Sequence, residues 1–443
     1  MMQTCSIAWF RRDLRLSDNP AWSGAQDAAN AVPLVVREPR LLDTAGPFRR
    51  RAFLDAVDAL GESLAATGVD LRIESGDPTE IVAGVAAEIG ASAVHVNADV
   101  TRWATRRDDA VSAALGAVPL HPHWGTLVHA PGTVLTKKGT LSRVFTPFHK
   151  QWQTLPLGEP LDLDESVPEP LGTAVERAGG YPATRDLPGV AGTTDLSTAL
   201  RFGMVSARAV VRRMLDEGDG GEAIVRQLAW RDWYAHITLG APDIDRVALR
   251  SEFDAIPWET GKDADAAFAA WSEGRTGYPI VDAGMRQLRE TGWMHNRVRM
   301  ISASFLVKDL LIDWRRGERF FRHWLRDGDI PSNAGNWQWV AGTGPDAAPY
   351  FRVFNPVTQS RRFDPDGAYI RSWVPELAGL DSRSIHAPWE AVPVDLAKMG
   401  VGLGVDYPTP IVDHALAREE TLRIYKAALQ NRTADPLGTS AEK

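Results

Sequence analysis

The chain has 443 residues, of which 44% are hydrophobic and 24% are charged, and its formal net charge is −8. This length predicts two domains with sizeable cores, and the composition is that of a soluble globular protein. A single cysteine, Cys5, excludes an internal disulfide and a thiolate metal cluster, and we expect no metal site. No stretch approaches the roughly 18 apolar residues of a membrane span, and the amino terminus is not typical of a signal peptide. We therefore expect a cytoplasmic monomer with no membrane partner.

The charge is unevenly distributed along the chain. Residues 285–373 contain 14 Lys and Arg against 9 Asp and Glu, although the whole chain is acidic. A locally basic face on an acidic protein favours focused binding to a polyanion such as nucleic acid. On charge alone, a solvated helix surface is an equally good interpretation.

Short β-branched segments alternate with helical patterns in the first 130 residues. The expected strands are residues 6–10, 32–36, 71–74 and 93–97, and the expected helices are residues 48–67, 78–89 and 102–115. Such alternation predicts a Rossmann-like α/β domain over residues 1–130, with a doubly wound parallel sheet and helices on both faces. No glycine fingerprint follows the first strand, so we do not expect a dinucleotide site of the usual kind.

The rest of the chain has a different character. Residues 155–194 are rich in Pro, Gly and acidic residues, so we expect a linker over residues 131–190. The pattern then becomes almost entirely helical, which predicts an all-α domain over residues 191–430. Expected helices there are residues 207–217, 221–239, 278–290 and 294–314. Residues 431–443 are polar, and we expect a disordered tail.

Residues 292–356 interleave tryptophans, arginines and amide side chains with glycine-rich turns. An ordinary core does not need this mixture, because buried Trp, Asn and Arg must each find a polar partner. A site for a large, planar, charged ligand does need it.

Several motifs resemble those of the DNA photolyase and cryptochrome family. They are IAWFRRDLRLSDNP at residues 7–20, the VFTPF core within residues 135–152, GTTDLS at 192–197, LAWRDWY at 228–234, GYPIVDAGMRQL at 277–288, and nearly all of residues 292–376. The resemblance covers the chain in order and is closest to the microbial class I cyclobutane pyrimidine dimer photolyases. It implies an α/β antenna-binding domain joined by a long linker to a helical domain that holds FAD. An antenna chromophore in the α/β domain is also expected from the resemblance, which leaves open a folate, a deazaflavin, another flavin or none, with deazaflavin the first choice.

The resemblance assigns a set of residues to the flavin. These are Tyr181, Thr193, Thr194, Asp195, Leu196, Ser197, Trp293, Arg299, Asp327, Gly328, Asp329 and Asn333. Hydroxyls and N–H groups of residues 193–197 would cradle the pyrophosphate, although a plain helix N-cap explains this hexapeptide equally well. Arg299 would be the cation near the flavin and the turn at 327–329. Asn333 would face the redox-active edge of the ring, where plant cryptochromes carry Asp, so Asn favours a photolyase.

Three tryptophans match the family's electron-transfer chain, which re-reduces the photo-oxidised flavin. They are Trp258, Trp314 and Trp337. Taken singly, each would far more often be an ordinary core residue, and only the flavin resemblance reverses that expectation.

A second set of residues would contact the DNA lesion. Trp230 and Trp339 match aromatic walls of a dimer pocket, and Asn296, Arg297 and Met300 match its floor and a phosphate contact. We expect one helix to present Trp293, Asn296 and Met300 on one face, and another to present Gln227, Trp230 and Arg231 on one face. Damaged bases leave the duplex to enter such pockets. Enzymes for the (6-4) photoproduct carry histidine where Asn296 and Met300 stand, which makes that activity less expected here.

Gln227 departs from the family pattern. Relatives that repair cyclobutane dimers usually carry Glu there, and Gln can donate a hydrogen bond but cannot transfer a proton. Gln at this position also occurs in (6-4) enzymes and in single-strand-preferring cryptochromes. We expect repair to be retained with altered efficiency. We also expect Arg185, Arg352 and Gln359 near DNA. Arg185 and Gln359 match DNA-facing positions of relatives, whereas Arg352 is equally well explained as part of a structural ion pair.

The expected function is therefore light-driven repair of cyclobutane pyrimidine dimers in bacterial DNA, a carbon–carbon lyase reaction that uses reduced FAD. One alternative is a cryptochrome-type photoreceptor that keeps FAD and the tryptophan chain without repair. Others are repair of the (6-4) photoproduct and a flavin-free nucleic-acid-binding protein, against which Asn333, Arg299 and the turn at 327–329 argue.

Overall fold

The computed structural model describes residues 4–161, 168–346 and 351–430. The expected tail at residues 431–443 lies outside these ranges. The chain forms two compact units, each made of several segments. Unit 1 comprises Met1–Arg185, Gly192–Asp243 and Arg322–Ser332, and unit 2 comprises Asp186–Ala191, Ile244–Phe321 and Asn333–Lys443. The domain boundaries expected near residues 130, 190 and 430 stay predictions.

Unit 1 contains a parallel five-stranded sheet of order β3-β2-β1-β4-β5. Its strands are β1 (Cys5–Phe10), β2 (Asn30–Arg37), β3 (Arg72–Ser75), β4 (Ala91–Asn97) and β5 (Leu120–His123). The helices of this unit are α1 (Pro20–Ala25), α2 (Pro39–Thr44), α3 (Pro47–Ala65), α4 (Pro78–Ile89), α5 (Arg102–Leu115), α6 (Phe145–Trp152), α7 (Glu169–Ala178), α8 (Tyr181–Thr184), α9 (Ser197–Phe202), α10 (Ala207–Leu215) and α11 (Gly218–Gly240).

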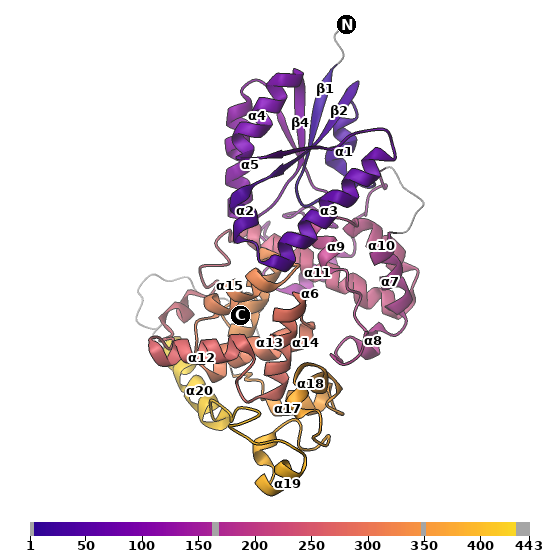
Figure 1. Ribbon diagram of the computed structural model, residues 1–443. Helices are drawn as coiled ribbons and strands as arrows, with labels where there is room; N and C mark the ends of the chain where they lie inside the picture. The colour runs from indigo at the N-terminus through magenta and orange to yellow at the C-terminus, as the bar shows by residue number, and fades with distance from the viewer. Residues whose placement is uncertain (1–3, 162–167, 347–350, 431–443) are drawn as a thin grey trace. The chain divides into compact units, whose positions relative to one another are not determined.

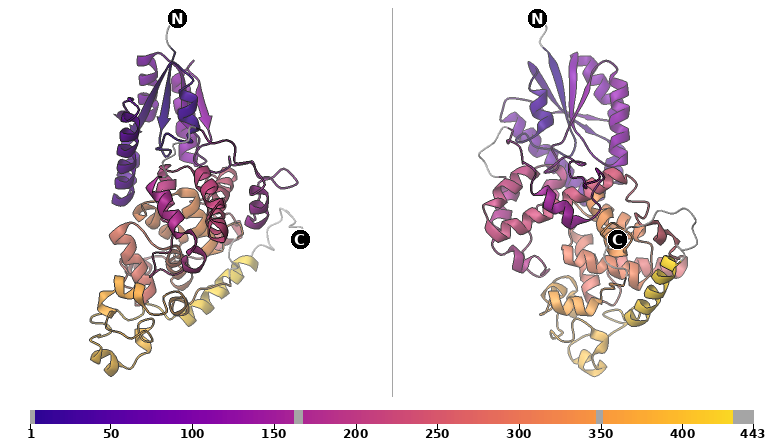
Figure 2. Two further views of the ribbon diagram at one scale, coloured as in Figure 1. Left: turned by 90° about the vertical axis from the view of Figure 1, so that its right-hand side faces the viewer. Right: turned by 180° about the vertical axis from the view of Figure 1, so that it is seen from behind.

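Both faces of the sheet are covered by helices (Figures 1 and 2). Because side chains alternate along a strand, Ile7 and Trp9 of β1 pack with residues of α4 and α5, whereas Ala8 and Phe10 pack with residues of α1 and α3. This arrangement confirms the predicted doubly wound α/β fold. The edge strand β5 was not expected, because its sequence LHPH has one apolar residue and a proline.

Unit 2 is helical. Its elements are η1 (Ser251–Ala255), α12 (Lys262–Glu273), α13 (Pro279–Thr291), α14 (Asn296–Ser304), η2 (Phe305–Asp309), α17 (Pro356–Phe363), α18 (Ala368–Trp373), η3 (Pro375–Leu377), η4 (Pro388–Glu390), α19 (Pro393–Lys398) and α20 (His414–Gln430). Two further helices, α15 (Trp314–Trp324) and α16 (Ile330–Ala341), begin in one unit and end in the other. The helical second half confirms the predicted class of this region.

The single helix expected over residues 294–314 was wrong. Helix α14 ends at Ser304, and the next turn, η2, is a π-helix. Leu311 then adopts a left-handed backbone with a φ of 50°, and a new helix begins at Trp314. The apolar pattern continues through this break, which is why periodicity alone did not reveal it.

Among the described residues, no helix has the length and apolar character needed to cross a membrane. Within the same ranges, no group of three or more His, Cys, Asp or Glu side chains is arranged to hold a metal ion.

Candidate functional site

The first group of candidate residues lies on α11 in unit 1. The Trp230 side chain is half-buried, and its ring stacks on Phe145 of α6 with a centroid separation of 3.6 Å and an interplanar angle of 8°. Trp233 meets Trp230 edge-on at 5.3 Å. One turn before Trp230, Gln227 donates its Nε2 amide to the carbonyl of Ala223 at 3.3 Å. The helix thus presents an indole that is supported on one face and partly open to solvent.

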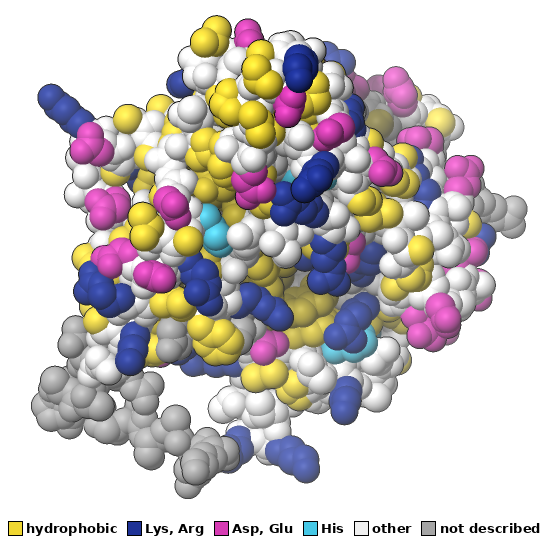
Figure 3. Space-filling view, turned by 90° about the horizontal axis from the view of Figure 1, so that it is seen from below, with side chains coloured by type: hydrophobic (Ala, Val, Ile, Leu, Met, Phe, Trp, Pro, Cys, Tyr) yellow, Lys and Arg dark blue, Asp and Glu magenta, His cyan; other side chains and the backbone are white. Residues whose placement is uncertain are grey.

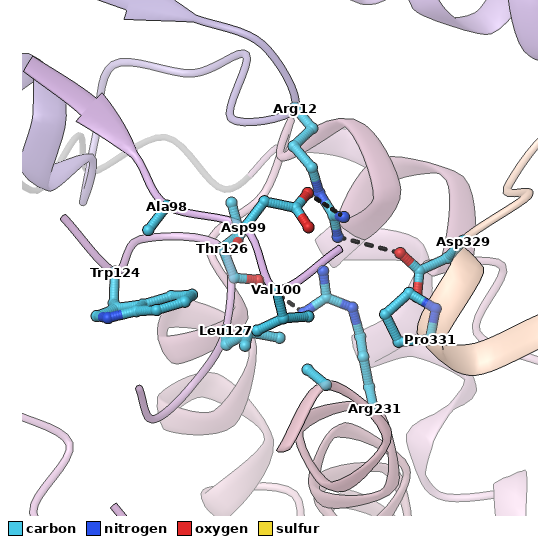
Figure 4. A pocket seen from close by; sticks show the side chains of 11 residues that line it. Arg12, Ala98, Asp99, Val100, Trp124, Thr126, Leu127, Arg231, Asp329 and Pro331 are labelled. Carbon is cyan, nitrogen blue, oxygen red and sulfur yellow. Dashed lines mark hydrogen bonds and ion pairs between the residues drawn. The ribbon is translucent and has the colours of Figure 1, made fainter. Parts of the chain in front are cut away.

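Arg231 has a different environment from Trp230, although both were expected at the lesion. Its Nη1 donates to the Thr126 carbonyl at 2.6 Å, and its Nη2 donates to the Leu200 carbonyl at 3.0 Å. Figure 4 shows this guanidinium in a small pocket lined also by Arg12, Asp99 and Asp329. These contacts give Arg231 a structural role within unit 1, and a contact between Arg231 and DNA stays a prediction.

The turn at residues 327–329 carries a carboxylate held by several arginines. Asp329 accepts from Arg12 Nη2 at 3.1 Å, and Arg12 also binds Asp99 at 2.9 Å (Figure 4). Burial alone would raise the pKa of Asp329, but nearby Arg12, Arg201 and Arg231 outweigh it and lower this pKa to about 2. Asp329 is therefore ionised at neutral pH.

The same aspartate begins helix α16. The carboxylate of Asp329 accepts hydrogen bonds from the backbone N–H of Ser332 at 3.2 Å and from its hydroxyl at 2.8 Å. An ionised carboxylate at this position satisfies an otherwise unpaired N–H group and interacts favourably with the helix dipole. The expected pairing of Arg299 with this turn stays a prediction, and the cations described around Asp329 are those of Arg12, Arg201 and Arg231.

The proposed phosphate-binding stretch at residues 193–197 precedes α9. The residue at the N-cap position of this helix is Leu196, which makes no side-chain hydrogen bond to the first turn, so a side-chain N-cap does not explain the motif. Among the described residues, Thr198 Oγ1 and Arg201 Nε and Nη1 are buried without a hydrogen-bond partner. The Arg201 guanidinium already lies near the carboxylates of Asp329 and Asp99. Of these groups, the Thr198 hydroxyl is therefore the one that an anionic group such as a pyrophosphate would engage, because a buried donor needs an acceptor.

Two neighbouring positions make specific contacts within unit 1. Tyr181 is 7% exposed, and the Arg185 guanidinium lies over its ring at 5.1 Å. Asp195 has a φ of 54° and forms an ion pair with Arg326 at 2.6 Å. The Asp195 side chain is therefore already engaged by a protein cation.

In unit 2, Asn333 is oriented by a buried carboxylate. Its Nδ2 donates to the Glu318 backbone carbonyl and to Glu318 Oε1, each at 3.0 Å, and Glu318 is fully buried. Because the amide nitrogen is engaged by Glu318, the Oδ1 atom is the part of Asn333 that is left to accept a hydrogen bond. This arrangement fits a neighbouring ring that carries an N–H donor, as a reduced flavin does.

The three candidate redox tryptophans all lie in unit 2. Trp337 is 2% exposed and packs edge-on against Phe321 at 5.0 Å, and it meets Trp271 at 6.3 Å. Trp314 is fully buried, with the Arg315 guanidinium 4.8 Å from its ring. Trp258 is partly buried against the cluster that contains Phe253 and Tyr425. An electron-transfer chain through Trp258, Trp314 and Trp337 stays a prediction.

Helix α14 presents only part of the expected lesion floor. Asn296 and Met300 lie one turn apart, with Asn296 Nδ2 3.7 Å from Met300 Sδ. Trp293 precedes this helix, so the prediction that one helix carries all three residues was wrong. The first N–H groups of a helix have no partner within the helix. At the start of α14, the Nδ1 atom of His295 accepts one of these hydrogen bonds, from the Arg297 N–H at 3.1 Å.

The other residues of unit 2 that we expect to contact DNA differ in their exposure and in their contacts with protein groups. Arg297 pairs with Asp186 at 2.9 Å, and its guanidinium lies 4.3 Å from the Phe363 ring. Trp339 and Gln359 are partly exposed, and Arg352 is exposed while its carbonyl accepts from Lys308 at 2.9 Å. Many Lys and Arg side chains are visible on the surface drawn in Figure 3.

Several residues that shape these sites were not found from the sequence. Phe145 lies in the VFTPF motif, but nothing in that motif indicated a partner on α11. Glu318 is the single acidic residue of the arginine-rich helix α15, and the sequence did not show that it is fully buried. Arg12 lies in the amino-terminal motif, where the double arginine after the first strand was the one signal available.

Comparison with known proteins covers nearly the whole chain. Residues 6–170 match the family model described as DNA photolyase, and residues 224–427 match the model described as FAD binding domain of DNA photolyase. A deoxyribodipyrimidine photo-lyase of Escherichia coli is 38% identical, over 97% of this chain and 100% of that protein.

Solved structures agree with this result. A bacterial class III photolyase from Agrobacterium tumefaciens superposes with a TM-score of 0.90 at 36% identity, covering 97% of this chain and 98% of that one. A cryptochrome from Synechocystis superposes with a TM-score of 0.86 at 28% identity, covering 95% of this chain and 99% of that one. The fold and site residues define a flavin-binding protein of the photolyase and cryptochrome type. The chain belongs to the DNA photolyase family.

Proposed function

We propose that this protein is a deoxyribodipyrimidine photo-lyase that repairs cyclobutane pyrimidine dimers in DNA under light. The observation that carries the proposal is the full-length similarity to the Escherichia coli protein of that name. The side chains at the expected sites suit the reaction, because Trp230 offers a supported aromatic surface and Asn333 offers an oriented amide.

FAD is the proposed cofactor. Thr193, Thr194 and Ser197 would hold its phosphates, and Asn333 would face its ring, with Tyr181, Trp293 and Arg299 nearby. When bound and reduced, FAD supplies the photoexcited electron that splits the dimer and receives that electron back. A second chromophore, a deazaflavin or a folate, is part of the proposal for the α/β domain.

The chain's own residues would bind and orient the dimer. Trp230 and Trp339 would stack on the extruded bases, and Asn296, Arg297 and Met300 would line the floor of the pocket. Gln227 would donate its amide N–H to a pyrimidine carbonyl, replacing its present bond to Ala223. A water-poor pocket of this kind strengthens each hydrogen bond to the transient anion.

The finer assignments also belong to this proposal. We assign the protein to the class I cyclobutane dimer enzymes, because Trp230 and Trp339 accompany Asn296 and Met300, where (6-4) enzymes carry histidines. We expect a monomer in the bacterial cytoplasm. The proposed DNA contacts include Arg185 and Gln359, which would make binding steeply dependent on salt.

Two substrates test the proposal. The protein with reduced FAD is incubated with one oligonucleotide that holds a cyclobutane thymine dimer and with another that holds a (6-4) photoproduct, in the dark and under near-ultraviolet light. We expect light-dependent repair of the first oligonucleotide alone. Repair of the second would move the protein to the other subfamily, and photoreduction of the flavin without repair of either would favour a photoreceptor.

A further inference from the structure

The support behind Trp230 is itself a notable feature of unit 1. Phe145 is 1% exposed, and its ring is nearly parallel to the Trp230 indole at a centroid separation of 3.6 Å. Aromatic pairs prefer offset or edge-to-face packing over such close face-to-face stacking. The surroundings must therefore hold the two rings together.

Helix α6, which begins with Phe145, is anchored to α11 along its length. Trp152 donates its indole N–H to Asp232 at 2.9 Å, and Phe148 packs on His236 with centroids 5.2 Å apart. From α11, Trp233 donates to the carbonyl of Ser142, just before α6, at 3.1 Å. These contacts fix the helix that carries Phe145, so the ring has little freedom to move away from Trp230.

A second residue of α11 contacts the same ring. The Arg226 guanidinium carbon lies 5.2 Å from the centre of Phe145, and Arg226 precedes Trp230 by one helical turn. His149, one turn along α6, stacks on Phe145 at 5.4 Å. Phe145 is thus at the centre of an aromatic and cationic cluster whose outermost indole is Trp230.

We propose that Phe145 is a positioning residue for lesion recognition, which sets the plane of the Trp230 ring before the damaged bases arrive. The inference rests on the proposed function. An extruded dimer gains most from stacking when the receiving indole already has its bound orientation, because no side-chain freedom is then lost on binding. Phe145 also covers one face of the indole, so the dimer has only the other face on which to stack.

The test compares two leucine variants on the same helix. Phe145→Leu removes the ring beside Trp230, whereas Phe148→Leu removes a ring that is equally buried, at 2% exposure, and packs on His236 instead. Full-length protein with bound FAD is titrated in the dark with an oligonucleotide holding one thymine dimer and with its undamaged counterpart. Thermal unfolding of each variant is measured alongside.

We expect Phe145→Leu to weaken binding of the dimer about threefold to tenfold and to leave binding of undamaged DNA unchanged. Phe148→Leu should lower the thermal midpoint without changing the preference for the dimer. In a Trp230→Ala background, Phe145→Leu should have no further effect on dimer binding, because there is no indole left to position.

Three results would overturn the inference. Phe145→Leu could match Phe148→Leu in dimer preference, its effect could persist in full without Trp230, or Trp230→Ala could leave dimer binding unchanged while the unmodified protein still prefers the dimer. Failure of the proposed function looks different, because the unmodified protein itself would then bind both oligonucleotides equally.

Discussion

Trp230 in unit 1 and Asn333 in unit 2 are positioned by different interactions. A parallel ring, Phe145, supports the Trp230 indole. The Asn333 amide nitrogen instead donates two hydrogen bonds to Glu318, one to its backbone carbonyl and one to its buried carboxylate. Stacking fixes the plane of a ring, while a directional hydrogen bond fixes which end of an amide faces outward. If Trp230 serves recognition and Asn333 serves the flavin, these two functions should be separable by mutation.

The largest expected effect concerns the start of the helix that carries Asn333. Asp329→Asn removes a carboxylate from a cluster of arginines, and we expect it to lower the free energy of unfolding at pH 7 by about 3 kcal/mol. Chemical denaturation at pH 7 measures this. Ser332→Ala is the matched control, since it removes one bond to Asp329 and leaves the charge in place. Equal losses in the two variants would mean that the charge contributes nothing.

The same aspartate predicts a pH dependence. Its pKa of about 2 lies below the usual value for aspartate, so the folded state binds fewer protons than the unfolded state between these values. The contribution of the Asp329 carboxylate to the free energy of unfolding is therefore complete above about pH 4 and is lost as the pH falls towards 2. We expect the difference in stability between the unmodified protein and Asp329→Asn to shrink over that window, as acid titrations of unfolding would show. A difference that stays constant would contradict the assignment.

Trp230→Ala should have the next largest effect. Stacking of a base on an aromatic side chain contributes about 1–3 kcal/mol, so binding of dimer-containing DNA should weaken by about fivefold to 100-fold. The absorption spectrum of bound FAD should not change, because Trp230 is not among the flavin residues. A changed flavin spectrum would show that the two functions are not separable.

Glu318→Leu tests the other half of the comparison. The substitution removes the Oε1 acceptor, so the Asn333 amide keeps only its bond to the backbone carbonyl of residue 318 and is held less firmly. We expect reduced flavin to reoxidise in the dark about tenfold faster, as for the loss of one hydrogen bond. Dimer binding should be unchanged. Glu318→Gln keeps an acceptor oxygen of the same size and should behave much more like the unmodified protein. Identical reoxidation in the Leu and Gln variants would exclude the orienting role.

The smallest expected effect is at Gln227. Gln227→Ala should lower the yield of repair per absorbed photon about fivefold, because one hydrogen bond to the transient anion is lost. Gln227→Glu should repair with the yield of the unmodified protein at low pH, where the carboxyl is protonated and can donate, and should lose yield as the carboxyl ionises. The repair yield of the unmodified protein should vary little with pH at this position, since an amide does not titrate. A flat profile for Gln227→Glu would argue against a donor role at this position.

The α/β fold was largely predictable, because β1, β2 and β4 are mostly apolar segments and the helices between the strands have clear periodicity. Strand β5 was missed, since LHPH lacks that signal. The break after Ser304 was missed because apolar residues continue on both sides of Lys308 and Asp309, through the π-helix to Leu311. Local patterns record which residues are buried and say little about where a helix stops.

The site was predictable in its residue types and less so in its contacts. Resemblance singled out Trp230 and Asn333, but Phe145 and Glu318, which support them, lie elsewhere in the sequence, and no local pattern indicates these contacts. Arg231 was expected at the lesion because it shares a helical face with Gln227 and Trp230, and that contact stays a prediction. The sequence did not show that Arg231 donates to the carbonyls of Thr126 and Leu200. Contacts of this kind join residues that are far apart in the sequence, so they become visible only in the folded chain.

The most direct test of the central claim is an action spectrum. The rate at which thymine absorbance returns in a dimer-containing oligonucleotide is measured with reduced protein at a series of wavelengths and in darkness. The account predicts no return in the dark and, under light, a rate that follows the absorption of the bound reduced flavin and of any antenna chromophore. Return in the dark, or photoreduction of the flavin without any return of thymine absorbance, would contradict it.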